Sequence, residues 1–499
     1  MEKIFDVAVV GSGLGGLISA ALLSKEGMSV LVLEQNQQFG GNLQTFTRNG
    51  FEFSTGMNYI GALDENQFLH PYFKYLNLFP DLNLRPLSCD GYEEIGFGTD
   101  QKRYRYAQGK ENFIEQLALD FPGERQNIAF YVQRIFEISD KFPLLHLEKF
   151  RTLIKGEDYL NGGAFDFIES LGANRRLKSV LGATNSLYAG NKEKTPLYVH
   201  ALVNRQFIQS AYRFVDGSKQ LVEALMKQII LNGGELLNRE EVTKIEFQNS
   251  ENAVVKTKSK RLFFAKKIIS NIHPALTLNM VEDVRLKKVY RQRIHGLDST
   301  SGMFSIYFIL KENSFAYIPY NIHHFATENV WFDKQEKWPQ QFMFYTPATS
   351  RSHNWASQAT ALSPMSFQEV KKWESTFVEN RGEEYRAFKQ QKAEQLIDLI
   401  EQRIPNFRSK IENYYTSTPL SYRDYTGTLN GAAYGIQKDF HNPFQTIVLP
   451  QTSIPNLFFT GQNMNMHGAL GVVAGAVLTA GGIVGLDYLT NKIFESTNS

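Results

Sequence analysis

Cysteine is almost absent from this chain, since Cys89 is the only one among its 499 residues. A single cysteine excludes a disulfide within the chain and a zinc site built from several thiolates. Apart from the adjacent His323 and His324, which a loop or strand edge explains better than a site, no histidines have metal-ligand spacing. No Gly-x-Ser-x-Gly turn marks a hydrolase nucleophile. No signal peptide is expected before a first strand that begins near residue 5. We therefore predict no metal ion and a cytoplasmic protein.

An excess of either charge is also lacking, because 53 Lys and Arg residues stand against 51 Asp and Glu residues. The resulting net charge of +2 argues against a strongly polyanionic partner. Residues 102–106 (KRYRY) combine cations with rings, as nucleic-acid binders do. Alternation along a strand, with arginines on one face and tyrosines on the other, explains this segment better. We expect no nucleic-acid partner.

Long uncharged runs are rare. One of them, residues 468–486, is long enough to be considered as a membrane-spanning helix. Its 19 residues could span a membrane, and Gly471 and Gly475 have the spacing of a membrane-helix dimer. However, the run contains six glycines and few large apolar residues, and it follows a strand expected at residues 457–460. A helix buried on every side of a soluble domain has the same composition, and this is the interpretation we prefer.

The most informative feature that is present is a glycine-rich turn, GSGLGG at residues 11–16. A strand expected at residues 5–10 precedes it and a helix expected at residues 17–25 follows it. In such a turn Gly11 permits the tight bend, Gly13 lets the backbone approach a pyrophosphate, and Gly16 lets the helix pack closely on the strand. The helix N-terminus then favours the negative charge of the pyrophosphate. The motif predicts dinucleotide binding.

The residues after the second expected strand indicate which dinucleotide is bound. This strand, residues 29–33, ends at Glu34, whose carboxylate would accept hydrogen bonds from both ribose hydroxyls and repel a 2′-phosphate. A second glycine pair, Gly40 and Gly41, follows within a few residues. This arrangement is typical of FAD enzymes of the glutathione-reductase type. Near the C-terminus, residues 456–485 repeat the order of strand, glycine turn and apolar helix, so both ends of the chain are expected to touch one FAD.

Several segments together resemble the FAD-dependent retinol saturases, carotenoid isomerases and phytoene desaturases. The resemblance spans nearly the whole chain and rests on residues 50–61 (GFEFSTGMNYIG), 214–221, 269–274, 418–419, 431–435 and 461–462. It implies an α/β fold, with a Rossmann-type FAD-binding domain assembled from separated segments and an α+β substrate-binding domain.

The motifs also predict the boundaries of the domains and, together with the resemblance, the residues that hold the cofactor. The FAD-binding domain would comprise residues 1–63, 211–279 and 443–499, and the substrate-binding domain residues 64–210 and 280–442. Within the former, Ser218 is expected to cap a helix over residues 218–231, and Val242 to begin a strand and meet the adenine through its backbone. The expected FAD contacts are Gly11, Ser12, Gly13, Leu14, Gly15, Gly16, Glu34, Gln35, Gly40, Gly41, Asn42, Val242, Gly461, Gln462 and Gly471.

The chain departs from the family at four positions. Ser54 stands where an aspartate is usual, Asn58 where a histidine is frequent, Asn42 where an arginine often follows the glycine pair, and Asn463 where an acid is common. FAD binding tolerates these changes, because backbone contacts carry most of it. The departures leave the substrate and the direction of the reaction open.

The resemblance implies hydride transfer between FAD and a carbon–carbon double bond of an apolar isoprenoid or polyene lipid. Reduction, as in the saturases, is favoured, with cis–trans isomerisation and phytoene-type desaturation as alternatives. A flavin amine oxidase is less favoured, and a flavin-bearing lipid carrier without activity least. Candidate catalytic residues are Asn58, Tyr59 and His467, with Tyr59 as a proton donor. No second GxGxxG motif is present, so an external electron donor or acceptor is expected.

A basic segment predicts a further partner. Residues 285–293 carry five cations and no acid, and a helix there would place Leu286, Val289, Tyr290 and Ile294 on one side. Such a helix could lie on an anionic membrane surface from which a lipid substrate is taken. Peripheral contact with the inner face of a membrane is therefore an additional expectation, beside the simpler one of a solvated helix.

Overall fold

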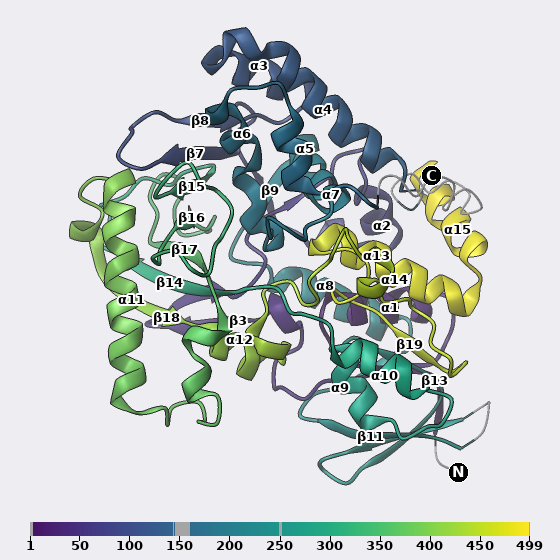
Figure 1. Cartoon of the computed structure of the whole chain (residues 1–499). Coiled ribbons are helices and arrows are strands. Elements are labelled where there is room, and N and C mark those ends of the chain that lie inside the picture. Colours follow the sequence, from purple (N-terminus) through teal and green to yellow (C-terminus); the bar gives the residue numbers. More distant parts are fainter. Residues whose placement is uncertain (1–2, 143, 145–159, 249–251, 499) are drawn as a thin grey trace.

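The computed structural model describes residues 3–142, 144, 160–248 and 252–498. Its first sheet is assembled from three distant parts of the chain, as Figure 1 shows by colour. The strands follow the order β10-β2-β1-β13-β12-β11, and β19 pairs with β13. Their bounds are β1 Ile4–Val10, β2 Val30–Leu33, β10 Glu235–Leu237, β11 Val242–Phe247, β12 Ala253–Thr257, β13 Leu262–Ser270 and β19 Leu457–Phe459.

The strands at the centre of this sheet are parallel and lie between helices. β1 pairs in parallel with both β2 and β13, and every residue of β2 is buried. Continuous apolar runs such as VLVL are typical of parallel strands covered on both faces. Helix α1 (Leu14–Lys25) packs on α8 (Lys219–Leu231) and on α14 (Gly468–Val484), which continues into α15 (Leu486–Asn498).

The uncharged run near the C-terminus is confirmed as a buried helix of this layer. α14 lies against α1 and α15, and Figure 1 shows it in yellow inside the fold. All eleven of its buried residues lie between Leu470 and Gly481. Within the described residues, no helix is both long and apolar enough to cross a membrane.

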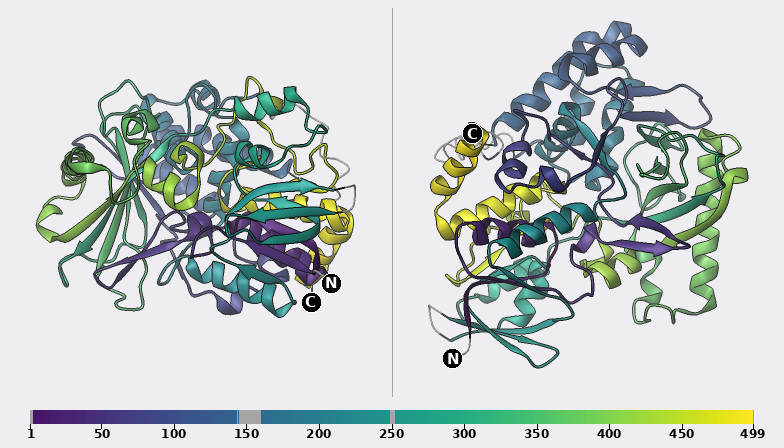
Figure 2. Two further views of the ribbon diagram at one scale, coloured as in Figure 1. Left: turned by 90° about the horizontal axis from the view of Figure 1, so that it is seen from below. Right: turned by 180° about the vertical axis from the view of Figure 1, so that it is seen from behind.

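The second sheet is mostly antiparallel and stands beside the first. Its order is β18-β14-β17-β16-β15-β7-β8, and the long helix α11 (Gly382–Arg403) covers its outer face (Figures 1 and 2). The strands are β7 Glu93–Phe97, β8 Tyr104–Tyr106, β14 Gly302–Leu310, β15 Asn321–Phe325, β16 Gln341–Tyr345, β17 Gln358–Met365 and β18 Ile411–Ser417. In β8, Tyr104 and Tyr106 are buried and Arg105 is exposed, so the alternation expected there is confirmed.

A layer of helices closes the space between the two sheets. Helix α7 is its central member, because it packs on α4 and α5 and contacts α14, one of the helices that cover the first sheet. The remaining small sheets are the hairpin β3-β4 and the three strands β5-β9-β6. The elements are α2 His70–Tyr75, α3 Lys110–Asp120, α4 Arg125–Asp140, α5 Ala164–Ser170, α6 Arg175–Gly182, α7 Leu197–Gln209, α9 Pro274–Met280, α10 Lys288–His295, α12 Pro419–Thr426, α13 Pro443–Thr446, β3 Thr45–Arg48, β4 Phe51–Ser54, β5 Ile60–Gly61, β6 Leu84–Pro86 and β9 Ala211–Phe214.

Two local expectations differ from the structure. Ser218 occupies the N-cap position of α8, but its hydroxyl makes no capping hydrogen bond, because the residue has helical rather than extended backbone angles. In α10 the expected apolar side is incomplete. Leu286 and Ile294 are buried in the core of the first sheet, whereas Val289 is 77% exposed.

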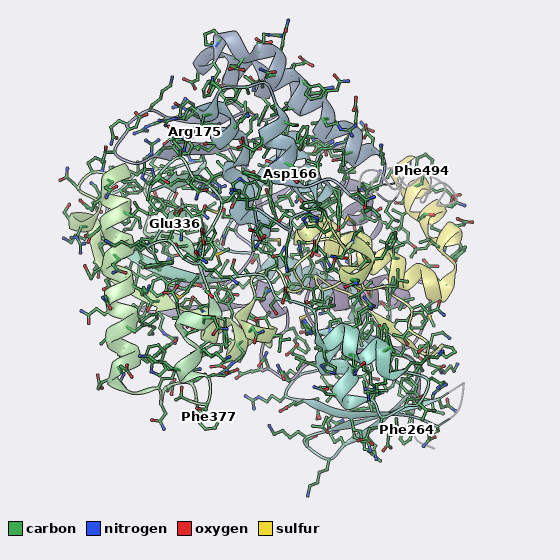
Figure 3. The ribbon with its side chains drawn as sticks, in the orientation of Figure 1. Asp166, Arg175, Phe264, Glu336, Phe377 and Phe494 are labelled. Carbon is green, nitrogen blue, oxygen red and sulfur yellow. The ribbon has the colours of Figure 1, made fainter. Side chains whose placement is uncertain are left out.

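Large exposed apolar side chains are scattered over the surface. Phe377, in the loop before α11, and Phe494, on α15, lie at distant margins of the molecule (Figure 3). Single exposed rings of this kind are ordinary on soluble proteins. The aromatic side chains therefore serve mainly the cores of the layers.

Candidate functional site

A cavity of about 700 Å³ lies where the first sheet, the second sheet and α7 meet. Its wall contains thirteen of the fifteen residues expected to contact FAD, all except Gly16 and Gly471. Asn58 and Tyr59, two of the three candidate catalytic residues, line it as well. Motifs separated by more than 400 residues are thus brought to one continuous wall.

The glycine turn (Gly11, Gly13, Gly15 and Gly16), here called the glycine cradle, is packed so closely that side chains would collide with its neighbours. Gly11 has a φ of +90°, which an L-residue rarely adopts. A Cβ on Gly13 would lie 2.6 Å from Asn271 Nδ2, and a Cβ on Gly16 would lie 2.3 Å from the carbonyl oxygen of Gly11. Gly16 therefore permits close packing of α1 on β1, as the motif predicts, without itself facing the cavity.

Gly15 is the point at which the two ends of the chain meet. A Cβ on Gly15 would lie 2.7 Å from the Cα of Gly461. Asn271, directly after β13, fills the space between them, since its Oδ1 would lie 2.8 Å from that Cβ and 2.5 Å from one on Gly461. Sequence reasoning did not single out Asn271 as a site residue. Its position directly after a buried parallel strand, at the carboxyl edge of the sheet, was the available signal.

Glu34 is held at the end of β2 with its carboxylate at the cavity wall. Its Oε2 accepts hydrogen bonds from the backbone N–H of Ser12 at 3.0 Å and from the Ser12 hydroxyl at 2.5 Å. Its Oε1 accepts from the backbone N–H of Asn36 at 2.9 Å. The side chain is thus fixed and buried, yet it lines the cavity, as a ribose-binding carboxylate must.

The second glycine pair closes over the first turn. Gly40 and Gly41 have φ of +114° and +57°, and Gly40 forms a parallel bridge with Gly13. The backbone N–H of Gly40 also donates to the Ser12 hydroxyl at 3.1 Å. The two glycine motifs therefore form one unit around the cavity.

The remaining predicted cofactor contacts occupy different positions. Leu14, Gln35, Val242 and Gln462 line the cavity. Gly471 does not, because it lies one turn inside α14. A Cβ there would lie 2.5 Å from the Cβ of Met466, so the glycine lets the helix pack against the turn before it.

The residues present fit FAD. The cradle of Gly11, Gly13 and Gly15 leaves room for a phosphate group, and Glu34 offers a buried acceptor for ribose hydroxyls. In addition, Asn42 and Asn463 belong to the cavity wall, and their buried Oδ1 atoms have no hydrogen-bond partner among the described residues. Buried polar atoms of this kind call for a bound partner.

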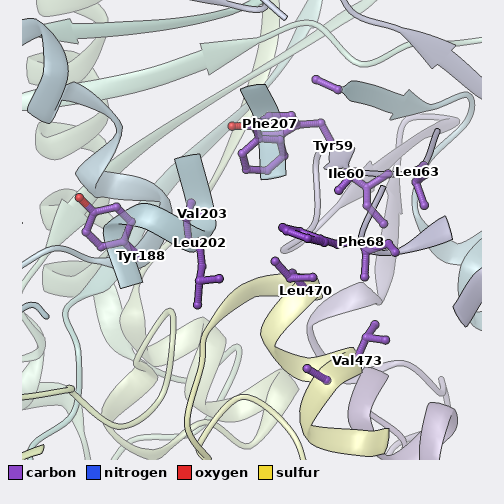
Figure 4. Close-up of a cluster of buried hydrophobic side chains, with 14 of the residues drawn as sticks. Tyr59, Ile60, Leu63, Phe68, Tyr188, Leu202, Val203, Phe207, Leu470 and Val473 are labelled. Carbon is purple, nitrogen blue, oxygen red and sulfur yellow. The ribbon is translucent and has the colours of Figure 1, made fainter. Parts of the chain in front are cut away.

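The opposite end of the cavity is apolar. Tyr59 stacks on Phe207 of α7 with ring centroids 4.2 Å apart, and Figure 4 shows the two rings beside Val203. Asn58 is held by the Tyr345 hydroxyl, which donates to its Oδ1 at 2.5 Å. The wall carried by α7 and the second sheet consists of Val203, Gln206, Phe207, Met303, Met343, Leu362 and Pro364. Among the described residues, this part of the wall contributes no charged side chain.

The third candidate catalytic residue, His467, does not line the cavity. It is the N-cap residue of α14, and its ring packs against Tyr434. Burial and the nearby Lys438 charge lower the pKa of His467 to about 3, so its imidazole is neutral at pH 7. A neutral imidazole behind the wall can position the turn before α14, but it offers no proton to the cavity.

Lys438 lies beneath the same turn and was not anticipated. It is 1% exposed, and its Nζ donates to the carbonyl oxygens of Asn463 at 3.5 Å, Thr446 at 3.0 Å and Met464. No carboxylate pairs with it within the described part of the chain. The lysine therefore ties the cavity-lining turn to the loop before β19 through carbonyl groups alone.

This buried lysine predicts a pH dependence of stability. Burial lowers the pKa of Lys438 to about 7, whereas an unfolded lysine titrates near 10.5. Between these values the unfolded chain holds one more proton, so this residue adds stability as pH rises, by about 1.4 kcal/mol per unit. Between pH about 7.5 and 9.5, we expect the free energy of unfolding to increase more with pH in the wild type than in Lys438→Met. Urea unfolding at several pH values measures both; the same change with pH in the two proteins would contradict this expectation.

Comparisons with known proteins agree with this geometry. A family model described as flavin containing amine oxidoreductase matches residues 14–481. All-trans-retinol 13,14-reductase of Rattus norvegicus is 27% identical and is aligned over 97% of this chain and 86% of its own length. Prolycopene isomerase 2, chloroplastic, of an Oncidium hybrid cultivar is 26% identical over 86% of this chain and 75% of its own. A solved oxidoreductase of Methanosarcina mazei shares the fold, with a TM-score of 0.65, 16% identity, and coverage of 94% of this chain and 98% of the other.

Proposed function

We propose that this chain, which belongs to the family of flavin containing amine oxidoreductases, reduces a carbon–carbon double bond of an apolar polyene. The family makes it an FAD-dependent oxidoreductase. The observation that carries the proposal is the uncharged wall of α7 and the second sheet, which suits a hydrocarbon chain. The likeness to retinol 13,14-reductases over nearly the whole chain supports the same choice.

We propose that each part of the site has a separate task. Bound FAD supplies a hydride acceptor or donor. The glycine cradle, Glu34 and Asn271 hold the cofactor. We assign residues 1–63, 211–279 and 443–499 to the FAD-binding domain. The apolar wall excludes water from the double bond, and Asn58, tied to Tyr345, orients the polyene. Tyr59 delivers the proton, while His467 positions the turn before α14.

Isomerisation is the second candidate, because prolycopene isomerases are similar to this chain over 86% of its length. Phytoene-type desaturation would use the same residues with the opposite direction of hydride transfer. Oxidation of an amine is disfavoured because the wall carried by α7 and the second sheet offers no carboxylate to an ammonium group. The carboxylates of the cavity, Glu34, Glu240, Glu374 and Asp424, belong to other parts of its wall. A lipid carrier without activity would bind a polyene and leave the flavin unchanged.

The decisive experiment is anaerobic. The flavin is reduced with dithionite, and its absorption is followed while retinoids and carotenoids are added in detergent. Return of the oxidised absorption together with a product heavier by two hydrogen atoms is the expected result. An isomerised lipid with the flavin still reduced would replace reduction by isomerisation. No reaction with any lipid would overturn the proposal and direct the same assay to oxidised enzyme with amines and saturated precursors.

We propose that electrons come from an external donor, since the sequence contains no second dinucleotide motif. We also propose that the lipid is taken up by a cytoplasmic enzyme in peripheral contact with the inner face of a membrane. Three arginines of the basic segment are bound within the protein, as Arg285 pairs with Asp283 at 2.6 Å and Arg291 and Arg293 donate to carbonyl oxygens. The contact would therefore use the exposed residues Val284, Lys287, Lys288 and Val289.

A further inference from the structure

The hydroxyl of Tyr59 is turned toward a buried carboxyl group. It donates to Glu93 Oε1 at 2.6 Å, and Glu93, on β7, is completely buried. The ring of Tyr59 lines the cavity, so this contact connects the cavity to the interior of the second sheet. Nothing in the sequence around Glu93, which is followed by a second glutamate, distinguishes it from an ordinary strand residue.

Glu93 belongs to a buried cluster with Asn321, His323 and Arg213, in which its negative charge faces the positive charge of the arginine. Asn321 Nδ2 donates to the Glu93 Oε1 at 3.2 Å. His323 Nε2 lies 3.0 Å from the Glu93 Oε2, although the two atoms do not have the geometry of a hydrogen bond. Arg213, which is also buried, donates to Asn321 Oδ1 at 2.8 Å and to two backbone carbonyl oxygens. No carboxylate pairs directly with Arg213 among the described residues, so Glu93 is the group that balances its charge through Asn321.

This arrangement restricts how Tyr59 can act as an acid. If Tyr59 lost its proton while Glu93 was ionised, two negative charges would lie within hydrogen-bond distance in a dry interior, at a large electrostatic cost. Burial and the Glu93 carboxylate accordingly hold the pKa of Tyr59 well above the usual range of tyrosine. Tyr59 can release its proton readily only when the cluster behind it supplies another.

We propose that Glu93, together with His323, is the proton source behind Tyr59 for the reaction in this cavity. The inference deepens the proposed reduction and rests on it. As the Tyr59 O–H bond breaks and a C–H bond forms on one substrate carbon, a proton carried by the Glu93 carboxyl group passes across their 2.6 Å contact to the Tyr59 oxygen. The other substrate carbon receives the hydride that reduced FAD supplies. At the end Tyr59 is again neutral and the pair has lost one proton.

The groups around the two residues come from several elements. Those facing Tyr59 are Glu93, Tyr92 and Tyr434, and those facing Glu93 are Tyr59, Tyr92, Tyr106, Arg213 and His323. Burial raises the pKa values of Tyr92, Tyr106 and Tyr434. These tyrosines therefore stay neutral at physiological pH.

The kinetic test compares Glu93→Gln with the wild type. Glutamine keeps the shape and the hydrogen-bonding oxygen but carries no exchangeable acid proton. We expect reoxidation of the reduced flavin by the polyene to slow by about 100-fold, the lower end of general acid catalysis. We also expect the wild-type rate to fall as rising pH removes the proton of the pair, and this fall to be absent in Glu93→Gln. Tyr59→Phe combined with Glu93→Gln should lose little more than either alone, because the two act as one unit.

Glu94→Gln is the matched control. Glu94 is the next residue on β7, equally buried, and points to the opposite face, where it pairs with Arg403 at 2.9 Å. This variant is expected to be less stable but to keep the wild-type pH profile. An unchanged rate and pH profile in Glu93→Gln would overturn the proposal.

A second test requires no substrate. 3-Fluorotyrosine placed at position 59 reports ionisation of that ring by ¹⁹F NMR in the FAD-bound protein. Because Glu93→Gln removes a negative charge, the label should ionise at lower pH in that variant than in the wild-type background. An identical titration in both would overturn the coupling of Tyr59 to Glu93. If the wild type reacts with no polyene, the proposed reduction fails, and this titration still decides whether the pair is coupled.

Discussion

Replacing Gly15 by valine is expected to weaken FAD binding by about 100-fold. The new Cβ would lie 2.7 Å from the Cα and 2.8 Å from the backbone nitrogen of Gly461, distances that real side chains do not adopt. Both atoms belong to backbone, so relief requires separation of the two turns that hold the cofactor. Overpacking of this kind costs ~3 kcal/mol, which corresponds to a loss of affinity of the order of 100-fold.

The measurement is the flavin content of the purified protein, followed by titration of the apoprotein with FAD. Gly475→Ala is the matched control, because Gly475 is a buried glycine of α14 whose Cβ would meet nothing within 4 Å. That variant should bind FAD normally and be slightly more stable, since alanine favours a helix by about 1 kcal/mol over glycine. Normal flavin content in Gly15→Val would show that the two ends of the chain do not meet at the cofactor.

Replacing Arg403 by methionine is expected to destabilise the protein by ~3–5 kcal/mol, because it leaves a buried carboxylate without its partner. Arg403, at the end of α11, donates to Glu94 Oε1 at 2.9 Å, and both side chains are at most 3% exposed. The remaining cation near Glu94 is Arg103, which is half exposed and 3.5 Å away. It cannot replace the charge and the hydrogen bond that are lost.

Urea or thermal unfolding measures this effect. Arg408→Met is the control, because Arg408 pairs with Glu394 and Asp398 at the surface and should cost at most about 1 kcal/mol. The double variant Arg403→Met/Glu94→Gln should recover part of the loss, since no charge then remains unpaired. Equal losses for Arg403→Met and Arg408→Met would mean that the buried pair does not stabilise the contact of α11 with β7.

Sequence alone sufficed for the features that depend on local backbone geometry. Gly11 and Gly40 are needed where φ is positive, and Gly16 where a helix packs on its own strand. Glu34 could be identified because it follows β2 directly. The buried nature of α14 could be predicted from its glycines. In each case the residue type is dictated by neighbours a few positions away, so the pattern is visible without a fold.

Only the tertiary structure decided which groups meet around the cavity. The hydrogen bond from Tyr59 to Glu93, the approach of His323 to Glu93 and the place of Asn271 between two glycine turns all join segments far apart in the chain. The carbonyl groups around Lys438 come from residues 8 to 26 positions later. Folding likewise put His467 behind the cavity wall, where burial keeps it neutral. Such contacts depend on how sheets and helices pack, and a glutamate, an asparagine or a lysine carries no local mark of the partner that packing assigns to it.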